Sequence, residues 1–278
     1  MIEPGEREAS APVVRVRGGT IATSDDWLAV ERPLEIRARA GGEERVVSTT
    51  MRTPGDDRLL AAGFLFAERV ISAVAQIRAL QSVDEDTVVV ELDVAGEAAL
   101  QAAQRSFLTN GGCGVCGRLS LRELLAVPVQ EGGDRRPTVS LALLQELPET
   151  LRAAQETFTR TGGLHAAGLF AVDGARLAVF EDVGRHNAVD KLVGARLLDG
   201  QLPQRDAILV VSGRASFELA QKAAVAGFGT MVAVGAPSSL AVETARQAGM
   251  TLIGFARADG FNVYTGAEHV EGIESKHG

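Results

Sequence analysis

The stretch AILVVSGRASFELAQKAAVAGFGTMVAVGAPSSLAVETARQAGMTLIGFA, residues 207–256, decides the fold class of this 278-residue chain. Three short apolar runs, at 207–211, 230–234 and 251–256, alternate with two segments of helical periodicity, at 216–226 and 239–247. Strands that are almost wholly apolar and that alternate with helices are typical of a parallel sheet covered on both faces. The sequence therefore predicts an α/β fold with a parallel layer in its carboxyl-terminal part.

Each of these apolar runs ends in small and polar residues. In an open α/β sheet the carboxyl ends of parallel strands line the ligand crevice, where small residues and helix N-termini can hold an anion. Glycine, serine and proline also form ordinary turns, so plain turns remain an alternative to a phosphate-binding crevice. None of the loops matches a P-loop or a Gly-x-Gly-x-x-Gly motif. The candidate residues at the first two strand ends are Ser212, Gly213, Arg214 and Ser238.

The sequence of the amino-terminal half predicts a small α+β domain over residues 21–135. A disordered tail is expected over residues 1–20, because that end of the chain is polar. Gly41-Gly42 and Asp84-Glu85-Asp86 are turn signals, each flanked by strand-like residues. The expected elements are strands at 27–40, 45–51, 76–82 and 87–92, a helix from Asp56 to about Arg69, and a helix at 97–107.

A polar segment at 130–137 is the candidate linker to a second domain, expected over 136–266 and followed by a tail over 267–278. Ser140 is expected to cap one short helix and Pro148 to open the next. The remaining expected elements are a helix end at Gly162-Gly163, a hairpin of 164–172 and 176–180 around Asp173-Gly174, and a helix at 187–198.

Composition restricts the class of protein. The start of the chain has neither a basic nor an apolar region of a secretory signal, and no apolar run reaches the roughly 20 residues that cross a bilayer. A net charge of −8 disfavours binding to nucleic acid by bulk electrostatics. We therefore expect a cytoplasmic protein that binds neither membrane nor nucleic acid.

Both cysteines of the chain, Cys113 and Cys116, lie in a glycine-rich stretch. Zinc would need His165 and His186 as further ligands, and these lack the usual tight ligand spacing, so no structural metal is expected. A thioredoxin-like dithiol is disfavoured by the surrounding glycines, and a glycine-flanked loop is a poor place for two buried cysteines. No acidic residue stands between positions 97 and 123, whereas three arginines do, which favours a reactive thiolate able to carry sulfur as a persulfide.

A nucleobase deaminase is a further alternative, because that class combines His-x-Glu with Pro-Cys-x-x-Cys around a catalytic zinc ion. Here the sequence His165-Ala166-Ala167 has alanine where the acid should stand, and the cysteine pair precedes the histidine. Deamination is therefore rejected, since the general base is missing.

Three segments resemble the FdhD family, the formate dehydrogenase accessory sulfurtransferases: TNGGCGVCG at 109–117, TGGLHA at 161–166 and EDVGRHNAVDK at 181–191. The resemblance extends from about residue 20 to 266, and the third segment is highly specific. Arg69 departs from the family, whose members often have glycine there. Further matching segments lie at 51–56, 63–68, 211–216, 235–239, 254–257 and 262–265.

This resemblance implies a sulfur carrier that takes sulfur from a cysteine desulfurase and passes it to the molybdenum cofactor, bis(molybdopterin guanine dinucleotide), for formate dehydrogenase. It also implies a cytidine-deaminase-like three-layer α/β/α second domain and a homodimer. By position, Cys113 corresponds to the persulfide-bearing cysteine and Cys116 to its partner. The residues that correspond to the cofactor-binding segment are Phe255, Ala256, Arg257, Ala258, Asp259 and Gly260. A non-catalytic chaperone for the cofactor is the alternative function.

Residues 181–191 leave two interpretations open. His186 is expected to be a hydrogen-bonded structural residue near a helix start, with a ligand contact as the alternative. Asp182 and Asp190 are expected to be a cap and a helix-face charge. Arg185 and Lys191 would either contact cofactor phosphates or remain solvated.

Overall fold

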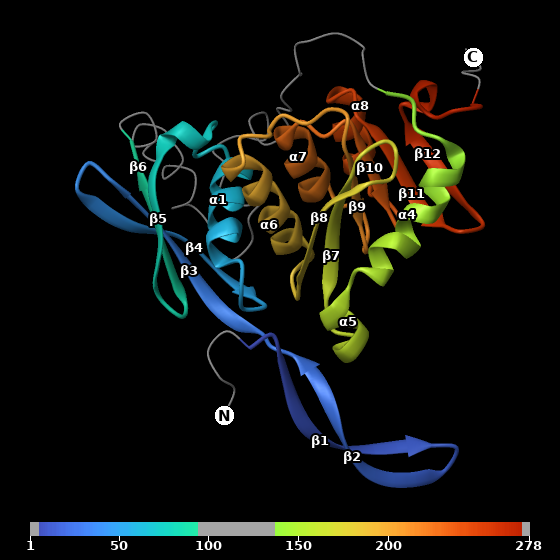
Figure 1. The fold of residues 1–278 in the computed structure, drawn as a ribbon, viewed down its shortest axis with the longest axis horizontal. Helices are drawn as coiled ribbons and strands as arrows, with labels where there is room; N and C mark the ends of the chain where they lie inside the picture. The colour runs from blue at the N-terminus through green and yellow to red at the C-terminus, as the bar shows by residue number, and fades with distance from the viewer. Residues whose placement is uncertain (1–5, 94–136, 274–278) are drawn as a thin grey trace.

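The computed structural model describes residues 6–93 and 137–273 of the chain. Three sheets organise these residues: a two-stranded arm, a four-stranded sheet and a six-stranded sheet. The arm projects from the body, and the two larger sheets lie on either side of a pair of central helices, α1 and α6 (Figure 1).

The six-stranded sheet has the order β12-β11-β10-β9-β7-β8. Its three central strands β9, β10 and β11 are parallel, whereas β7 runs antiparallel to β9, and both edge strands run antiparallel to their neighbours. The predicted parallel layer is therefore confirmed, and β12 is an antiparallel edge strand that the sequence did not indicate. The strands are β7 (His165–Phe170), β8 (Arg176–Asp182), β9 (Ile208–Val211), β10 (Thr230–Ala233), β11 (Thr251–Arg257) and β12 (Gly260–Thr265).

Helices cover both faces of this sheet, which gives the expected three layers. Along β9, Ile208 and Val210 belong to the apolar cluster beneath α4, whereas Leu209 and Val211 belong to the cluster beneath the helices of the opposite face. Successive side chains of a strand point to opposite faces, so an unbroken apolar strand serves both layers. One face carries α4 (Leu141–Ala153), and the other carries α6 (Arg185–Leu198), α7 (Phe217–Ala226) and α8 (Ser239–Gln247).

The four-stranded sheet has the order β4-β3-β6-β5 and confirms both predicted hairpins. Gly41 and Gly42 adopt positive φ between β3 and β4, which only glycine reaches without strain. The helix α1 (Asp57–Ala67) begins after Asp56 as predicted. The other elements are β3 (Arg32–Ala40), β4 (Glu43–Arg52), the short 3₁₀ helix η1 (Val74–Gln76), β5 (Ile77–Asp84) and β6 (Thr87–Leu92).

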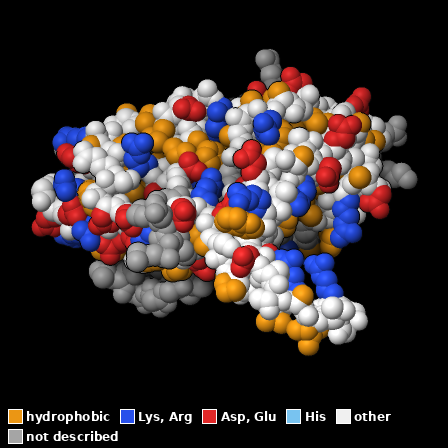
Figure 2. Space-filling model, turned by 60° about the horizontal axis from the view of Figure 1, so that its bottom comes forward, with side chains coloured by type: hydrophobic (Ala, Val, Ile, Leu, Met, Phe, Trp, Pro, Cys, Tyr) orange, Lys and Arg blue, Asp and Glu red, His pale blue; other side chains and the backbone are white. Residues whose placement is uncertain are grey.

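The amino-terminal segment corrects the prediction of a disordered tail over residues 1–20. β1 (Glu8–Arg17) and β2 (Thr20–Ala29) pair over their whole length around Gly18-Gly19, so residues 8–20 are folded. Trp27 was expected to begin the following strand, but it belongs to β2. The polar composition was misleading because this hairpin is held by strand pairing and contains no buried residue. Its surface carries exposed hydrophobic side chains (Figure 2).

Two further expectations are wrong. A single helix α4 continues through Pro148, because Leu144, Leu147 and Leu151 bury one continuous face against the sheet and packing overrides the local preference of proline. The segment from 267 is not a free tail, since Val270 is buried and pairs with Val139 beside the 3₁₀ helix η2 (Ala267–His269). Ser140 does cap α4, and Gly162 ends α5 (Glu156–Thr161) in the left-handed conformation.

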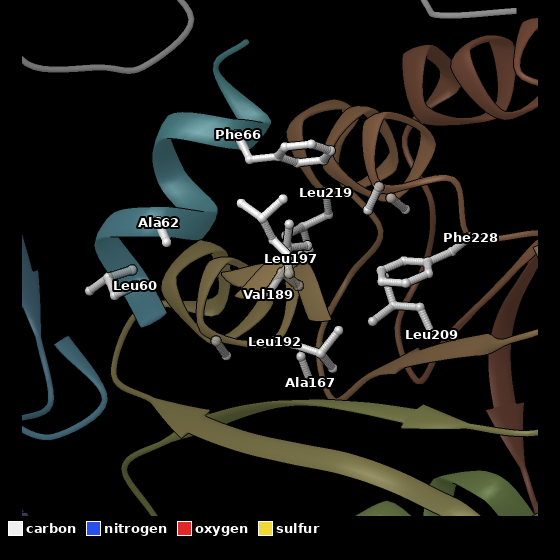
Figure 3. Close-up of a cluster of buried hydrophobic side chains, with 14 of the residues drawn as sticks. Leu60, Ala62, Phe66, Ala167, Val189, Leu192, Leu197, Leu209, Leu219 and Phe228 are labelled. Carbon is white, nitrogen blue, oxygen red and sulfur yellow. The ribbon is translucent and has the colours of Figure 1, made fainter. Parts of the chain in front are cut away.

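Helices α1 and α6 cross in close contact, and we call this crossing the seam. A Cβ atom on Gly63 would lie 1.9 Å from the carbonyl oxygen of Asp190, and one on Gly194 would lie 1.9 Å from that of Leu59. Only two glycines allow the backbones to approach so closely. Phe66 of α1 points toward the apolar side chains of α6 and α7 (Figure 3), and one buried cluster contains residues of both halves of the chain, so the two parts share one core. The predicted helix at 97–107 and the linker before position 137 lie outside the described residues.

Candidate functional site

A cavity of about 590 Å³ opens where the parallel strands end. Its volume lies in the range typical of small-molecule sites, about 300–1,000 Å³. Ser212 follows β9, Val234 follows β10, and Arg257 ends β11, so three neighbouring strands supply one wall. The opposite wall comes from α4 and α5, through residues that include Leu151 and Phe158.

The structure brings some of the predicted cofactor-binding residues together and leaves others apart. Ser212, Ala256, Arg257 and Ala258 line the cavity. The loop that contains Gly213 and the loop that contains Gly235 run side by side, joined by a hydrogen bond of 2.9 Å from Gly235 N to Gly213 O. The predicted residues that do not line the cavity are Gly213, Arg214, Ser238, Phe255, Asp259 and Gly260.

Positive charge dominates the polar part of the cavity wall. The guanidinium of Arg152 stacks 4.4 Å from the ring centroid of Phe158, which fixes its plane. Arg257 and His165 lie in the same wall, and Glu149 is the one carboxylate among the lining residues. A ligand in this cavity would meet several donors and an apolar surface, which suits an anion attached to a flat ring.

Three arginines at this edge have no carboxylate within 4 Å among the described residues: Arg185, Arg214 and Arg257. The Nε atom of Arg185 is also shielded from solvent and has no hydrogen-bond acceptor there. Burial lowers the pKa of His165, and the charges of Arg185 and His186 lower it further. The imidazole is therefore mainly neutral near pH 7, and the local field favours an incoming anion.

Gln155 lines the cavity and, like Arg185, has a buried nitrogen atom without a hydrogen-bond partner among the described residues. The residue is 3% exposed, and its amide Nε2 has no acceptor among the described residues. A buried donor without a partner costs about 1–3 kcal/mol, so such groups often mark a site whose partner is a ligand. Sequence reasoning missed this residue, because no motif surrounds it.

The segment 181–191 supports the cavity from behind. Both carboxylate oxygens of Glu181 accept hydrogen bonds from α5, one from Thr157 N at 2.9 Å and one from Phe158 N at 2.8 Å. These are free N–H groups at the first turn of a helix, where a negative charge is favourable. Glu181 thereby holds the α5 wall of the cavity against the sheet, although it does not line the cavity itself.

Asp182 and Lys191 form a buried ion pair at the seam. Lys191 Nζ lies 2.7 Å from Asp182 Oδ2, and both side chains are fully buried. Asp182 also accepts from Thr53 N and Gly184 N, and Lys191 donates to Thr53 O. The idea that Lys191 contacts cofactor phosphates is therefore wrong, and this pair instead fastens the strand β4 region to α6.

A second buried pair lies deeper along the seam. Lys222 Nζ donates to both oxygens of Asp190, at 2.7 and 2.9 Å. Burial raises the pKa of Asp190 to about 6, against the opposing charge of Lys222. Although burial lowers the pKa of Lys222, the charges of Asp190 and Glu68 outweigh it, and the pKa is raised. At neutral pH the pair is ionic and anchors α7 to α6.

His186 is hydrogen-bonded, in line with the structural interpretation. Its Nε2 lies 2.7 Å from Glu218 Oε2 and 3.4 Å from Ser216 Oγ. The hydrogen bond from His186 lowers the pKa of Glu218. His186 therefore joins the first turn of α6 to the first turn of α7 beside the cavity.

The cysteines Cys113 and Cys116, the proposed sulfur-carrying residues, lie outside the described residues. Within residues 6–93 and 137–273, no group of three or more His, Cys, Asp or Glu side chains could hold a metal ion. In the same ranges, no helix is long and apolar enough to cross a membrane.

The comparisons with known proteins identify the family of this chain. The FdhD/NarQ family model matches residues 29–271. The chain belongs to the FdhD/NarQ family. It is 46% identical to the sulfur carrier protein FdhD of Nocardia farcinica over 279 residues, which cover 98% of each chain. It is 45% identical to the protein of the same name from Streptomyces coelicolor, over 93% of this chain and 94% of that one.

A solved structure shares the fold of this FdhD/NarQ family member. The crystal structure of a formate dehydrogenase accessory protein from Desulfotalea psychrophila superposes with a TM-score of 0.73 at 23% identity. The match covers 95% of this chain and 100% of that chain.

Proposed function

We propose that the protein is a sulfur carrier that accepts sulfur on Cys113 and delivers it to a molybdenum cofactor needed by formate dehydrogenase. The observation that carries the proposal is the 46% identity, over 98% of both chains, to a protein named sulfur carrier protein FdhD. The Cys113-Gly-Val-Cys116 pair supports it, because a thiolate is the nucleophile that sulfur transfer requires.

The first step is a thiol–persulfide exchange with a cysteine desulfurase. The Cys113 thiolate attacks the outer sulfur of the persulfide on the donor cysteine. One S–S bond breaks, the donor leaves as a thiolate, and a new S–S bond makes Cys113 the persulfide. Atoms and electrons balance without an added oxidant or reductant. Cys116 is the neighbouring thiol that can share or release the sulfur.

The acceptor binds at the carboxyl edge of the six-stranded sheet. Bis(molybdopterin guanine dinucleotide) carries diphosphates and flat heterocycles, and the cavity offers Arg257 and Arg152 for the former and Phe158 and Leu151 for the latter. A volume of about 590 Å³ suits one nucleotide end and not the whole cofactor. The protein would work in the cytoplasm and as a homodimer.

A cofactor chaperone without sulfur chemistry is the second candidate, because the cavity alone supports binding. Replacing Cys113 with alanine decides between the two. A sulfur carrier loses its ability to activate formate dehydrogenase, whereas a chaperone keeps it.

The direct test uses mass spectrometry after incubation with a cysteine desulfurase and free cysteine. The expected result is one added sulfur atom on Cys113, lost in Cys113→Ala. The matched variant Cys116→Ala should still be loaded. Absence of added sulfur on the wild type would contradict the proposal.

A further inference from the structure

One wall of the cavity is a helix that cannot hold its own position. α5 has six residues, and an isolated helix of that length is not stable in water, so neighbouring segments must keep it in place. Phe158 and Gly162, which are one helical turn apart, line the cavity, and the lining continues along the chain as far as His165. We call residues 156–165 the α5 wall.

The other side of the α5 wall contacts the β1–β2 arm where the arm joins the body (Figure 1). The guanidinium of Arg160 stacks 4.4 Å from the ring centroid of Trp27 in β2. Its Nε atom lies 2.9 Å from Oε2 of Glu8 in β1. A Cβ atom on Gly163 would lie 3.2 Å from the Cβ atom of Ala29, so the two segments pass close to each other. Both strands of the arm therefore contact the α5 wall.

The arm residues that make these contacts lie on one face of the hairpin. Glu8 is paired with Ala29, and Ser10 is paired with Trp27. Cross-strand partners share a face, as do residues two positions apart along a strand, so these side chains point to the same side. We call Glu8, Trp27 and Ala29 the arm base. The register of the hairpin thus directs the arm base toward α5, although neither strand contains a buried residue.

The body of the protein holds the beginning of α5, and the arm base holds its end. The carboxylate of Glu181 accepts from the first turn of α5, and Arg152 donates to Thr159 Oγ1 at 3.0 Å. Arg7, directly before β1, donates to the carbonyl oxygen of the same Glu181 at 3.0 Å. The contacts of Arg160 with the arm base lie further along the helix. The position of the α5 wall therefore depends on the arm as well as on the sheet.

We propose that Glu8, Trp27 and Arg160 are positioning residues for the cavity, because the arm base holds the α5 wall where a ligand needs it. None of the three lines the cavity. Ordering a loose wall during binding lowers affinity, so a wall already in place binds more tightly. The inference rests on the proposed nucleotide site and adds residues outside it that determine its affinity. By linkage, a ligand that fixes the α5 wall also changes the surroundings of Trp27.

The first test is calorimetric titration of guanosine diphosphate into full-length variants. Trp27→Leu and Arg160→Met remove the contact from its two sides, and each should weaken binding about fivefold or more. Trp27→Phe keeps an aromatic ring and Arg160→Lys keeps the cation, so both should retain most of the affinity. The matched control is Ile21→Ala, at the turn end of the same arm face, where the side chain is 72% exposed. It should bind like the wild type.

The second test needs no ligand. Amide hydrogen exchange in residues 156–165 reports how firmly the α5 wall is held. These amides should exchange faster in Trp27→Leu and Arg160→Met than in the wild type, and at the wild-type rate in Ile21→Ala. If the wild type does not bind guanosine diphosphate, the proposed nucleotide site fails, whereas the exchange rates still decide whether the arm base holds α5.

The third test uses Trp27, the single tryptophan of the chain, as a spectroscopic reporter. Its fluorescence should change as guanosine diphosphate is added, with the dissociation constant found by calorimetry. Arg257→Ala, which alters the cavity and not the arm, should shift that titration to higher nucleotide concentration. Wild-type affinity and exchange rates in both Trp27→Leu and Arg160→Met, equal losses in Ile21→Ala, or fluorescence unchanged at saturating nucleotide would each overturn the inference.

Discussion

Charged side chains gather in two regions, the seam between α1 and α6 and the cavity at the carboxyl edge of the six-stranded sheet. The charges are paired at the seam and largely unpaired at the cavity. At the seam Asp182 meets Lys191, and Asp190 meets Lys222, with nearly every polar atom hydrogen-bonded. At the cavity Arg257 has no carboxylate partner, and the Gln155 amide lacks an acceptor among the described residues. The paired charges of the seam stabilise the fold, whereas the unpaired groups of the cavity are the ones that the proposed ligand would contact.

The largest loss of unfolding free energy is expected from breaking the ion pair between Asp182 and Lys191 at the seam. Lys191→Met leaves Asp182 buried without its cation, which costs about 3–5 kcal/mol of unfolding free energy. Urea denaturation measures it, with the exposed Arg176→Met as the control that should change little. A loss below about 1 kcal/mol would show that the seam does not depend on this pair.

A steric change at the seam should be nearly as damaging. Gly63→Ala places a methyl group 1.9 Å from the Asp190 carbonyl oxygen, so the helices must separate, at a cost of about 2–3 kcal/mol or more. Gly42→Ala is the control, since its Cβ meets nothing within 4 Å and only its positive φ costs about 1 kcal/mol. Equal losses in thermal or urea unfolding would contradict a close crossing.

Unlike the variants at the seam, a variant at the cavity should not lower the free energy of unfolding. Gln155→Leu removes a buried unsatisfied donor, so the ligand-free protein should be as stable as the wild type or up to about 1 kcal/mol more stable. Its affinity for guanosine diphosphate should fall about tenfold, as measured by calorimetry. Gln247→Leu, at an exposed position of α8 bonded to Glu243, should change neither. A destabilised Gln155→Leu would give this amide a structural role.

The smallest expected effect is the dependence of the unfolding free energy on the protonation of His165. Because the pKa of His165 is lowered in the folded protein, unfolding takes up a proton below about pH 6.5, and the free energy of unfolding falls as the pH drops through this range. His165→Asn should weaken that slope. Binding of an anion should raise the His165 pKa, which NMR titration of the imidazole protons can follow. A pKa unmoved by nucleotide would place the anion elsewhere.

The sequence predicted the central fold well, because strands buried on both faces are readable as apolar runs between helical segments. It missed the arm, although Gly18-Gly19 is a turn signal, since no residue there is buried and composition suggested disorder. It missed β12 as a strand because the β11–β12 turn at Ala258-Asp259 resembled a ligand loop. Arg69, the departure from the family pattern, adopts a φ of +60°, which explains why glycine suits that turn.

For the site, the sequence could locate residues that follow strands, since their place at the sheet edge is fixed by topology. Ser212 was placed at the sheet edge in this way, Arg257 was placed by the family resemblance, and both line the cavity. The α4 and α5 wall was missed, because Arg152 and Gln155 reach the cavity through packing between distant segments. The role of Lys191 was missed for the same reason, because its burial against Asp182 depends on packing between segments that are distant in the sequence.

The most direct test of the contrast between paired and unpaired charge is calorimetric titration of guanosine diphosphate into three proteins. The wild type should bind, Arg257→Ala should bind at least about tenfold more weakly with an unchanged melting temperature, and Arg246→Ala, whose arginine is exposed and paired with Glu243, should bind like the wild type. Equal affinity for all three proteins, or no binding to the wild type, would contradict the assignment of this edge as an anion site.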